Sequence, residues 1–313
     1  MIVPTVTPSL AARLLDSLRA AGGSFETIVV DNGTGSADLA GAAEGLSGAS
    51  VLRLERNEGY GRAVNRAARE AGGEALVLLN DDSVVDPGYV ERIVAALDPA
   101  AGVVMAAGVM RDFGAPELIE TAGVELDATL LAHDYLNGEP LSVLEGPLRD
   151  PIGPSGAAAA FGREAFLELG GFDEALFAYL EDVDLILRLR SAGARCRLAK
   201  DARGVHQHSA TLGVGSARKD YLAAFGRGYL LRKWNVITPR RAPAVLVREL
   251  GQSLLQAAID RNLGPIRGRL NGLRAAEPSE AYPSPVVLGD SPSLGDAVAR
   301  RWRRRSRLRA RSD

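Results

Sequence analysis

Thr27-Ile28-Val29-Val30-Asp31-Asn32-Gly33 decides the fold, because four β-branched residues in succession end at three residues that favour turns. A run of this kind, without alternation of polar and apolar residues, is typical of a strand buried on both faces. Similar apolar runs occur at residues 2–3, 51–54 and 76–79. Strands buried on both faces need helices over both faces of their sheet. The pattern therefore predicts an α/β protein.

Amphipathic segments separate these strands. Residues 10–21, 61–71 and 89–97 each place apolar side chains on one helical stripe. The alternation of strand and helix predicts a doubly wound, mostly parallel sheet. Ligands of such sheets bind beyond the carboxyl ends of the strands, where Asp31 and Asn80-Asp81-Asp82 lie.

The second half of the chain is less regular. Residues 112–154 have no clear period, which predicts a connection over the sheet edge, as a small hairpin or lid. Strands are predicted at 157–161 and 195–198, and helices at 163–169, 181–192, 219–234 and 244–262. We predict a catalytic domain at 1–215, a helical extension at 216–275, and a flexible Pro/Ser linker with an Arg-rich tail at 276–313.

The composition fits a globular cytoplasmic protein. Of the 313 residues, 46% are hydrophobic and 24% charged, which argues against global disorder. Cys196 is the only cysteine, so an internal disulfide is excluded and a reducing compartment is expected. Neither a secretory signal nor an apolar run long enough to span a bilayer is visible.

The charge is concentrated at the C-terminus. Residues 299–313 hold eight arginines and one aspartate, a net charge of +7, so the remainder carries −9. Such a tail suits the inner face of an anionic membrane or a nucleic-acid backbone, and a solvated tail without a partner is the third interpretation. The acidic body makes nucleic acid the weaker partner, and none is expected. The membrane contact is assigned to residues 300–311.

Acidic residues supply the first candidates for chemistry. Asp81 and Asp82 follow a buried strand and offer hard oxygen ligands for Mg²⁺ or Mn²⁺, although a polar turn explains them equally. Glu181, Asp182 and Asp184 open a helix, where one or two acids would suffice to complement the helix dipole. Crowded carboxylates raise the pKa of one member, as a general base requires.

Two further features are weaker when taken alone. Gly59 and Gly61 precede a helix, where backbone N–H groups can approach a phosphate, but the third glycine of a dinucleotide fingerprint is missing. His206 and His208 are two of only three histidines and lie in a predicted loop, so either is a candidate metal ligand.

Taken in order, these segments resemble the family 2 glycosyltransferases, which have the GT-A fold. The resemblance covers residues 2–235, and the blocks that carry it are 29–34, 57–65, 78–82, 170–174, 177–185, and His206 with Ser209. The stretch that ends at Trp234 also resembles bacterial rhamnosyltransferase-like members.

The resemblance implies a role for each matching residue. Nucleotide contacts are implied for Thr5, Asp31, Asn57, Gly59, Gly61, Asn65 and Asp81. The acceptor side is implied to include Gly156, Glu181 and Asp184, with Asp182 as the catalytic base and with Asp82 and His206 holding the divalent ion. Two departures are Asn80, where the first aspartate of the metal motif would stand, and Val6-Thr7 after a short first strand.

The resulting hypothesis is an inverting, metal-dependent transfer of a sugar from a dTDP- or UDP-sugar to a glycan or lipid-linked glycan. Rhamnosyl transfer in the synthesis of cell-surface polysaccharide is the specific form expected. Arg227 or Arg232 is a further candidate for contact with the diphosphate, although a solvated helix face explains both. The alternatives are a non-catalytic nucleotide- or glycan-binding relative and a sugar nucleotidyltransferase, whose basic Gly-rich loop is not found at residues 5–10.

Overall fold

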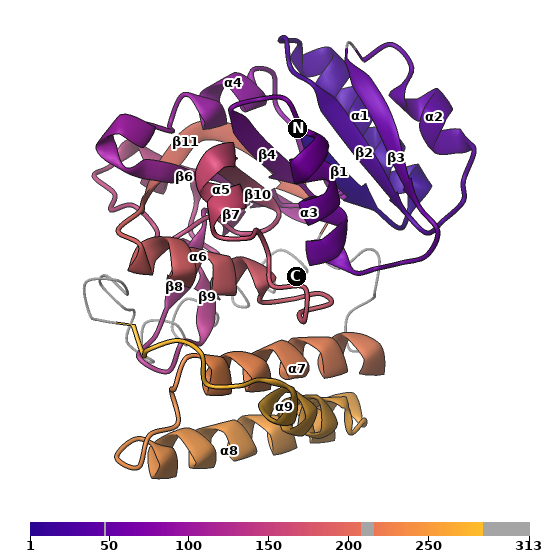
Figure 1. Cartoon of the computed structure of the whole chain (residues 1–313). Coiled ribbons are helices and arrows are strands. Elements are labelled where there is room, and N and C mark those ends of the chain that lie inside the picture. Colours follow the sequence, from indigo (N-terminus) through magenta and orange to yellow (C-terminus); the bar gives the residue numbers. More distant parts are fainter. Residues whose placement is uncertain (47, 208–215, 284–313) are drawn as a thin grey trace, which may run out of the picture.

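A computed structural model describes residues 1–46, 48–207 and 216–283. Strands and helices alternate through the first half, and three helices follow the last strand (Figure 1). The strands are β1 (Ile2–Thr5), β2 (Thr27–Asn32), β3 (Ala49–Leu54), β4 (Ala75–Leu79), β5 (Ser83–Val85), β6 (Val103–Asp112), β7 (Ala115–Thr121), β8 (Val124–Leu126), β9 (Ala132–Asp134), β10 (Ala158–Gly162) and β11 (Arg195–His206). The α-helices are α1 (Pro8–Ala21), α2 (Asp38–Ala43), α3 (Tyr60–Glu70), α4 (Tyr89–Val94), α5 (Arg163–Glu168), α6 (Glu181–Ser191), α7 (Ala217–Lys233), α8 (Ala242–Asp260) and α9 (Gly264–Ala275).

Nine of these strands form one mixed sheet, in the order β3-β2-β1-β4-β10-β6-β11-β5, with β7 paired to β6. The strands β1, β2, β3, β4, β6 and β11 run in the same direction, and β5, β7 and β10 run against them. The predicted mostly parallel α/β sheet is therefore confirmed. Parallel order brings the carboxyl ends of β1, β2 and β4 to one edge of the sheet.

Two hydrophobic cores cover the two faces of this sheet. Alternate residues of each strand point to opposite faces, so Ile28 and Val30 enter one core while Val29 enters the other. The first core packs against α3, α5 and α6, and the second against α1, α2 and α4. This two-sided burial explains why the central strands are continuous apolar runs.

Several elements were not predicted. β6 is an apolar run from Val103 to Met110, and such a run cannot be assigned to strand or helix by periodicity. β11 was predicted to end at residue 198 but continues to His206, through a register shift between Leu198 and Arg203. The polar residues at that irregularity hid the continuation. His206 therefore ends a strand and does not lie in a loop.

The irregular region forms two structures. β7 joins the main sheet at β6, and β8 pairs with β9 as a separate hairpin. The helices α7, α8 and α9 lie below the sheet in the view of Figure 1, with α8 at the lower edge. Among the described residues, no helix has the length and apolar character needed to cross a bilayer. Of the predicted linker and tail at 276–313, residues 284–313 lie outside the described residues.

Candidate active site

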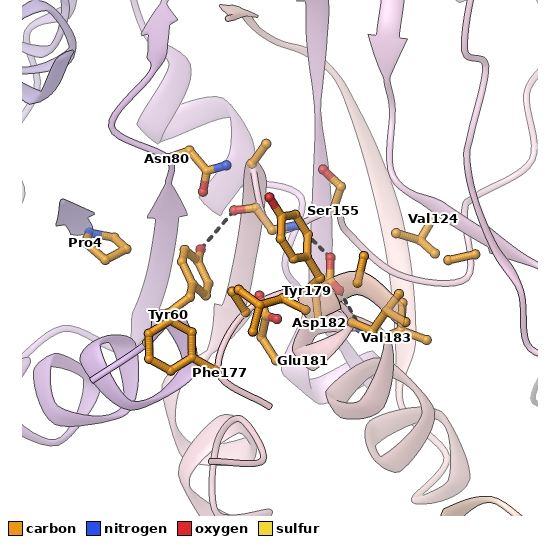
Figure 2. Close-up of a pocket in the computed structure, with 18 of the residues that line it drawn as sticks. Pro4, Tyr60, Asn80, Val124, Ser155, Phe177, Tyr179, Glu181, Asp182 and Val183 are labelled. Atoms are coloured by element: carbon orange, nitrogen blue, oxygen red, sulfur yellow. Dashed lines mark hydrogen bonds between the residues drawn. The ribbon is translucent and has the colours of Figure 1, made fainter. Parts of the chain in front are cut away.

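A cavity of about 610 Å³ lies at the carboxyl edge of the parallel strands. The ends of β1 and β4 line it on one side, the loop before α6 lines another, and residues of α7, α8 and α9 complete the wall. Figure 2 shows Tyr60, Ser155, Glu181 and Asp182 around this space. Its position agrees with the place where ligands bind in open α/β sheets.

Asp182 is fixed in this cavity by backbone groups. One carboxylate oxygen accepts the N–H of Gly156 at 3.0 Å, and the other accepts the N–H of Val183 at 2.8 Å. The hydroxyl of Tyr60 donates to the carbonyl of Gly156 at 3.0 Å, so the loop that holds Asp182 is itself anchored to α3 (Figure 2). A carboxylate oriented in this way can accept a proton from a hydroxyl bound in the cavity.

Glu181 lies beside Asp182 and is 6% exposed. Its Oε2 atom has no hydrogen-bond partner among the described residues. Burial, followed by the charge of Asp182, raises the pKa of Glu181 to about 8. Burial also raises the pKa of Asp182, against the opposing effect of the N–H groups of Gly156 and Val183. Burial thus disfavours two charges on this pair, and Glu181 holds a proton to a higher pH than a free glutamate does.

The turn into α6 has an unusual backbone. Tyr179 and Leu180 have φ angles of 71° and 68°, a left-handed conformation that residues other than glycine seldom adopt. A Cβ on Gly226 of α7 would lie 2.7 Å from the carbonyl oxygen of Tyr179. The absence of a side chain at Gly226 thus lets α7 pack directly against this turn. Paired left-handed residues of this kind cluster at functional sites.

Asp82, His206 and Glu120 also line the cavity, and the His206 ring lies between the two carboxylates. His206 Nε2 lies 2.9 Å from Asp82 Oδ1, and His206 Nδ1 lies 2.9 Å from Glu120 Oε2. All three side chains are at most 7% exposed. Burial lowers the pKa of His206, but the hydrogen bonds to Asp82 and Glu120 outweigh it and raise the pKa to about 10.

The 2.9 Å contact between Asp82 and His206 is a hydrogen bond, and the Nε2 atom of His206 would have to lose its proton before it could bind a metal ion. Asp82, with a deprotonated His206, would then be the pair that holds a divalent ion here. Glu120 would fix the imidazole orientation, as carboxylates do in metal sites. The described residues contain no cluster of three His, Cys, Asp or Glu ligands. An ion here would complete its shell with phosphate and water, as Mg²⁺ does.

Asp81 is held next to this pair by the first strand. Thr5 at the end of β1 donates to Asp81 at 2.6 Å. Burial raises the pKa of Asp81 to about 6, with the Thr5 hydrogen bond opposing the rise and the Asp82 charge adding to it. Thr5, Asp81 and Asp82 all line the cavity.

The predicted phosphate-binding loop, which contains Asn57 and Gly59, forms another part of the cavity wall. Asn32 Nδ2 donates to the carbonyl of Gly59 at 3.1 Å, and Asn32 Oδ1 accepts the N–H of Glu58 at 2.8 Å. Gly59 has a φ of 89°, and a Cβ there would lie 2.4 Å from the carbonyl oxygen of Phe177. Glycine is therefore required where this loop meets the loop before α6. Asn32, Asn57 and Gly59 line the cavity.

Four predicted site residues do not line the cavity. Asp31 accepts from Thr34 at 2.6 Å and Asn65 accepts from the N–H of Phe172 at 2.9 Å, so both brace loops. Gly61 packs against Phe172, where a Cβ would lie 3.2 Å from its Cβ atom. Asp184 is fully buried, with Arg188, Lys233 and Trp234 around its carboxylate. These four residues hold neighbouring loops and helices in place and do not contact the cavity.

Other cavity residues were missed by the sequence analysis. Glu120 lies in the region without a clear period, and no local signal indicates its contact with His206. Arg218 of α7 also lines the cavity, with its guanidinium 5.7 Å from the centre of the Phe177 ring. Arg227 lines it too but is engaged with Glu249, whereas the lining does not include Arg232. His208 and Ser209 lie outside the described residues.

Comparison with known proteins agrees with this arrangement. The glycosyl transferase family 2 model matches residues 2–123, and the glycosyl transferase family group 2 model matches residues 75–237. The O-antigen biosynthesis protein RfbC of Myxococcus xanthus is 32% identical over 222 residues, which are 65% of this chain and 17% of that protein. The N-acetylglucosaminyl-diphospho-decaprenol L-rhamnosyltransferase of Mycobacterium tuberculosis is 28% identical over 228 residues, 63% of this chain and 70% of that enzyme.

Solved structures are similar in fold. GalNAc-T7 with UDP, GalNAc and Mn²⁺ superimposes with a TM-score of 0.60 at 18% identity, over 74% of this chain and 47% of that chain. The mannosyltransferase PcManGT of Pyrobaculum calidifontis, with GDP-Man and Mn²⁺, gives a TM-score of 0.52 at 19% identity, over 95% of this chain and 76% of that chain. The expected GT-A fold is confirmed, as is the likeness to a bacterial rhamnosyltransferase. With a family model matched over residues 75–237, more than half of its length, the chain belongs to the family 2 glycosyltransferases.

Proposed function

We propose that this chain is an inverting, metal-dependent glycosyltransferase that moves a sugar from a nucleotide-diphosphate sugar to a hydroxyl of a glycan or lipid-linked glycan. One observation carries the proposal: the oriented carboxylate of Asp182 and the Asp82–His206 pair line the same cavity. Family membership supports the reaction class. Residues 1–215 are the proposed catalytic domain and residues 216–275 its helical extension.

The donor occupies the side of the cavity formed by β1, β4 and the loop after β3. Asn57 and Gly59 approach the nucleotide, and Thr5 and Asp81 border it. Asp82 and a deprotonated His206 would hold Mg²⁺ or Mn²⁺, with Glu120 accepting from the other imidazole nitrogen. Such an ion would neutralise charge on the departing diphosphate. The similar structures that contain UDP or GDP-Man with Mn²⁺ support this choice of ligands.

The acceptor occupies the side formed by the turn into α6. Asp182 takes the proton from the acceptor hydroxyl, and that oxygen forms a bond to the anomeric carbon as the bond to the diphosphate oxygen breaks on the opposite face. Glu181, protonated near neutral pH, leaves the charge on Asp182 and can donate to an acceptor oxygen. The two backbone N–H groups keep Asp182 in place during the transfer.

The substrates proposed are a dTDP- or UDP-sugar, with rhamnose as the sugar, and a lipid-linked precursor of cell-surface polysaccharide. The names of the Myxococcus and Mycobacterium relatives support this choice. We retain the proposal of a cytoplasmic location at the inner face of the membrane, with residues 300–311 as one contact. A sugar nucleotidyltransferase is not favoured by the family match. The presence of Asp31, Asp82 and Asp182 together argues against a non-catalytic relative.

Calorimetric titration of UDP and dTDP, with and without Mn²⁺, tests the donor site in wild type and Asp82→Ala. We expect binding that depends on the metal in the wild type and is lost in Asp82→Ala. If neither nucleotide binds, GDP is the remaining donor base to titrate. Failure of all three would overturn the proposal in favour of a non-catalytic module.

Asp182→Asn tests the catalytic base. The amide cannot accept the proton, so transfer should fall by at least about 100-fold while nucleotide affinity stays within about twofold. Asp16→Asn, on the exposed face of α1, is the matched control and should keep full activity. Should the Asp182 variant retain most of its turnover, the base has been assigned to the wrong residue.

A further inference from the structure

The outer face of α8 is entirely apolar. Every exposed residue of this helix with a described side chain is apolar, including Leu246, Val247, Leu250, Leu254 and Leu255. Their exposed fractions range from 49% to 74%. Of the eight exposed large hydrophobic residues in the described chain, seven lie between Leu246 and Leu270, and Phe113 is the exception. A soluble surface seldom gathers its exposed apolar side chains on one helix.

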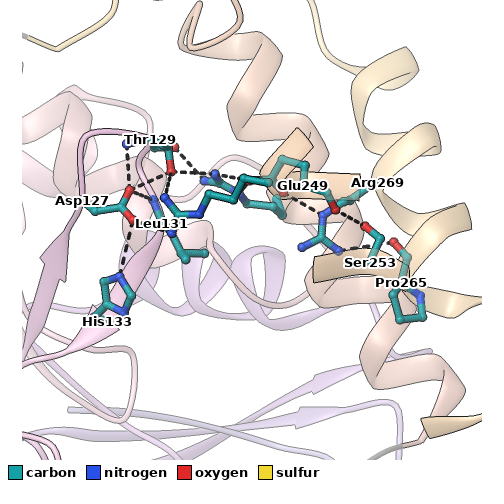
Figure 3. A network of polar contacts seen from close by, with 10 residues as sticks. Asp127, Thr129, Leu131, His133, Glu249, Ser253, Pro265 and Arg269 are labelled. Carbon is teal, nitrogen blue, oxygen red and sulfur yellow. Dashed lines mark hydrogen bonds and ion pairs between the residues drawn. The ribbon is translucent and has the colours of Figure 1, made fainter. Parts of the chain in front are cut away.

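The inner face of α8 is tied to the rest of the protein, so the helix cannot rotate to bury its leucines. Glu249 accepts from Arg227 of α7 at 2.6 Å and from Arg269 of α9 at 2.8 Å. Arg248 reaches Asp127, in the connection between β8 and β9, at 2.7 Å. Figure 3 shows this network on the inner side of the helix, with Ser253 one turn further along. The leucines therefore point away from the protein body.

Exposed basic residues flank α8 in the sequence. Arg240 and Arg241 precede α8, and Arg261, Arg267 and Arg274 follow it, all five exposed. Across residues 240–276 no carboxylate is exposed, since Glu249 is buried and Asp260 only half-exposed. A helix with a leucine face and arginines at its borders has the chemistry of an interfacial helix, which lies in the plane of an anionic bilayer. Arginine attracts the headgroups, and leucine enters the acyl boundary.

We propose that α8 is a membrane-docking surface, which lays its face of Leu246, Val247, Leu250, Leu254 and Leu255 into the headgroup region of an anionic bilayer. The arginines argue against two other occupants. A two-fold dimer through this face would bring together two copies of a region, 240–276, that has exposed arginines and no exposed carboxylate to pair with them. The chain's own tail at 299–313 carries eight more arginines and would be repelled by those beside α8.

The position of α8 connects this surface with the acceptor, and this step rests on the proposed function. Gln256 of α8 and Arg269 of α9 line the same cavity as Asp182. The acceptor side of the cavity therefore extends toward the helix that lies on the bilayer. A lipid-linked acceptor reaches Asp182 from the membrane surface, without leaving it.

Membrane docking is tested with a fluorescent label on the apolar face of α8. Cys196 is buried and is the only native cysteine, so Val247→Cys labelled with an environment-sensitive dye reports one position. With vesicles of phosphatidylcholine containing about a third phosphatidylglycerol, we expect a blue shift and an at least about twofold rise in emission. Phe113→Cys is the matched control, because Phe113 is as exposed as Leu246 but distant from α8 in sequence. It should show neither change.

Affinity for the same vesicles is measured by cosedimentation of Leu250→Gln/Leu254→Gln and of Phe113→Gln. The double variant should bind at least about tenfold more weakly than wild type, with Phe113→Gln unchanged. No blue shift at residue 247 with vesicles overturns the proposal. A label at residue 247 whose emission is already blue-shifted without vesicles, relative to the label at residue 113, also overturns the proposal. If that shift depends on protein concentration, a second copy covers the face; if it does not, the chain's own tail covers it. Titration of UDP with Mn²⁺ on the same proteins tests the donor site separately, so the two proposals fail by different readouts.

Discussion

At the scale of single residues, the candidate site depends on partners that are distant in sequence. Asp182 is oriented by Gly156, and His206 lies between Asp82 and Glu120. The residue types predict chemistry, but their contacts decide which atom is available for it.

Glu120 is a positioning residue for His206. Glu120→Ala removes the acceptor for His206 Nδ1, and we expect affinity for Mn²⁺ in the presence of UDP to fall about 10- to 100-fold. Glu120→Gln keeps a hydrogen-bond acceptor and should recover part of that loss. Glu117→Ala, exposed on the same strand, is the control for calorimetry. Equal metal affinity in wild type and Glu120→Ala would exclude a role for Glu120 in orienting His206.

The raised pKa of Glu181 makes stability depend on pH. Between its ordinary pKa near 4.5 and its folded value of about 8, the folded state holds a proton that the unfolded state has released. The free energy of unfolding therefore falls as pH rises through this window. Each unit of pKa difference corresponds to about 1.4 kcal/mol, so Glu181→Gln should be stabilised relative to wild type by at least about 1 kcal/mol more at pH ~8 than at pH ~5.

Urea unfolding at the two pH values measures this difference. Glu164→Gln, exposed on α5, should follow the wild type at both. A difference between wild type and Glu181→Gln that does not change with pH would show that Glu181 is not held protonated by the fold.

At the scale of elements, α7 and α9 pack backbone to backbone. Gly264, Gly268 and Gly272 recur every four residues along one face of α9. A Cβ on Gly268 would lie 2.2 Å from the carbonyl oxygen of Tyr221, and one on Gly272 would lie 2.0 Å from that of Phe225. This close contact holds α7 in the position where Gly226 meets the turn into α6.

Gly268→Ala should therefore separate the two helices. Overpacking against backbone costs about 1–3 kcal/mol, and the melting temperature should fall by several degrees. Gly251→Ala on α8 is the matched control, because nothing lies within 4 Å of its added Cβ. Alanine is the better helix former there and should stabilise by up to about 1 kcal/mol. Equal thermal unfolding of the two variants would show that α7 and α9 are not in backbone contact.

At the scale of the whole molecule, buried polar contacts join the helical part to the loops and to α6. Arg227, 2% exposed, bonds to Glu249 of α8 and to the carbonyl of Thr129 at 2.9 Å. Lys233 of α7 bonds to Asp173 and Asp184 at 2.7 and 2.9 Å. The helices are thus fixed against the loops that carry the acceptor side of the cavity.

Arg227→Met tests this connection. Removing one partner leaves Glu249 buried with Arg269 alone, and we expect a loss of about 3–5 kcal/mol in the free energy of unfolding. Arg232→Met, exposed on the same helix, should change stability by less than about 0.5 kcal/mol. Urea unfolding distinguishes the two. A small effect of Arg227→Met would mean that apolar packing alone holds the helical part.

The sequence by itself determined the α/β class, the parallel strands β1 to β4, the helices α1, α3 and α4 and the acidic block at the start of α6, because buried apolar runs and helical stripes are local patterns. The six-residue helix α2 was not predicted. Only the tertiary structure decided that Glu120 meets His206, that Asp184 lies beneath the cavity, and that α8 turns its leucines outward. β6, α9 and the second half of β11 also escaped prediction, since a fully buried run, a glycine-rich helix and a strand with an irregular register have no clear period. The physical reason is common to all of these. Contacts between residues far apart in the chain depend on how whole elements pack, and a local sequence pattern does not specify which distant residue a side chain will contact.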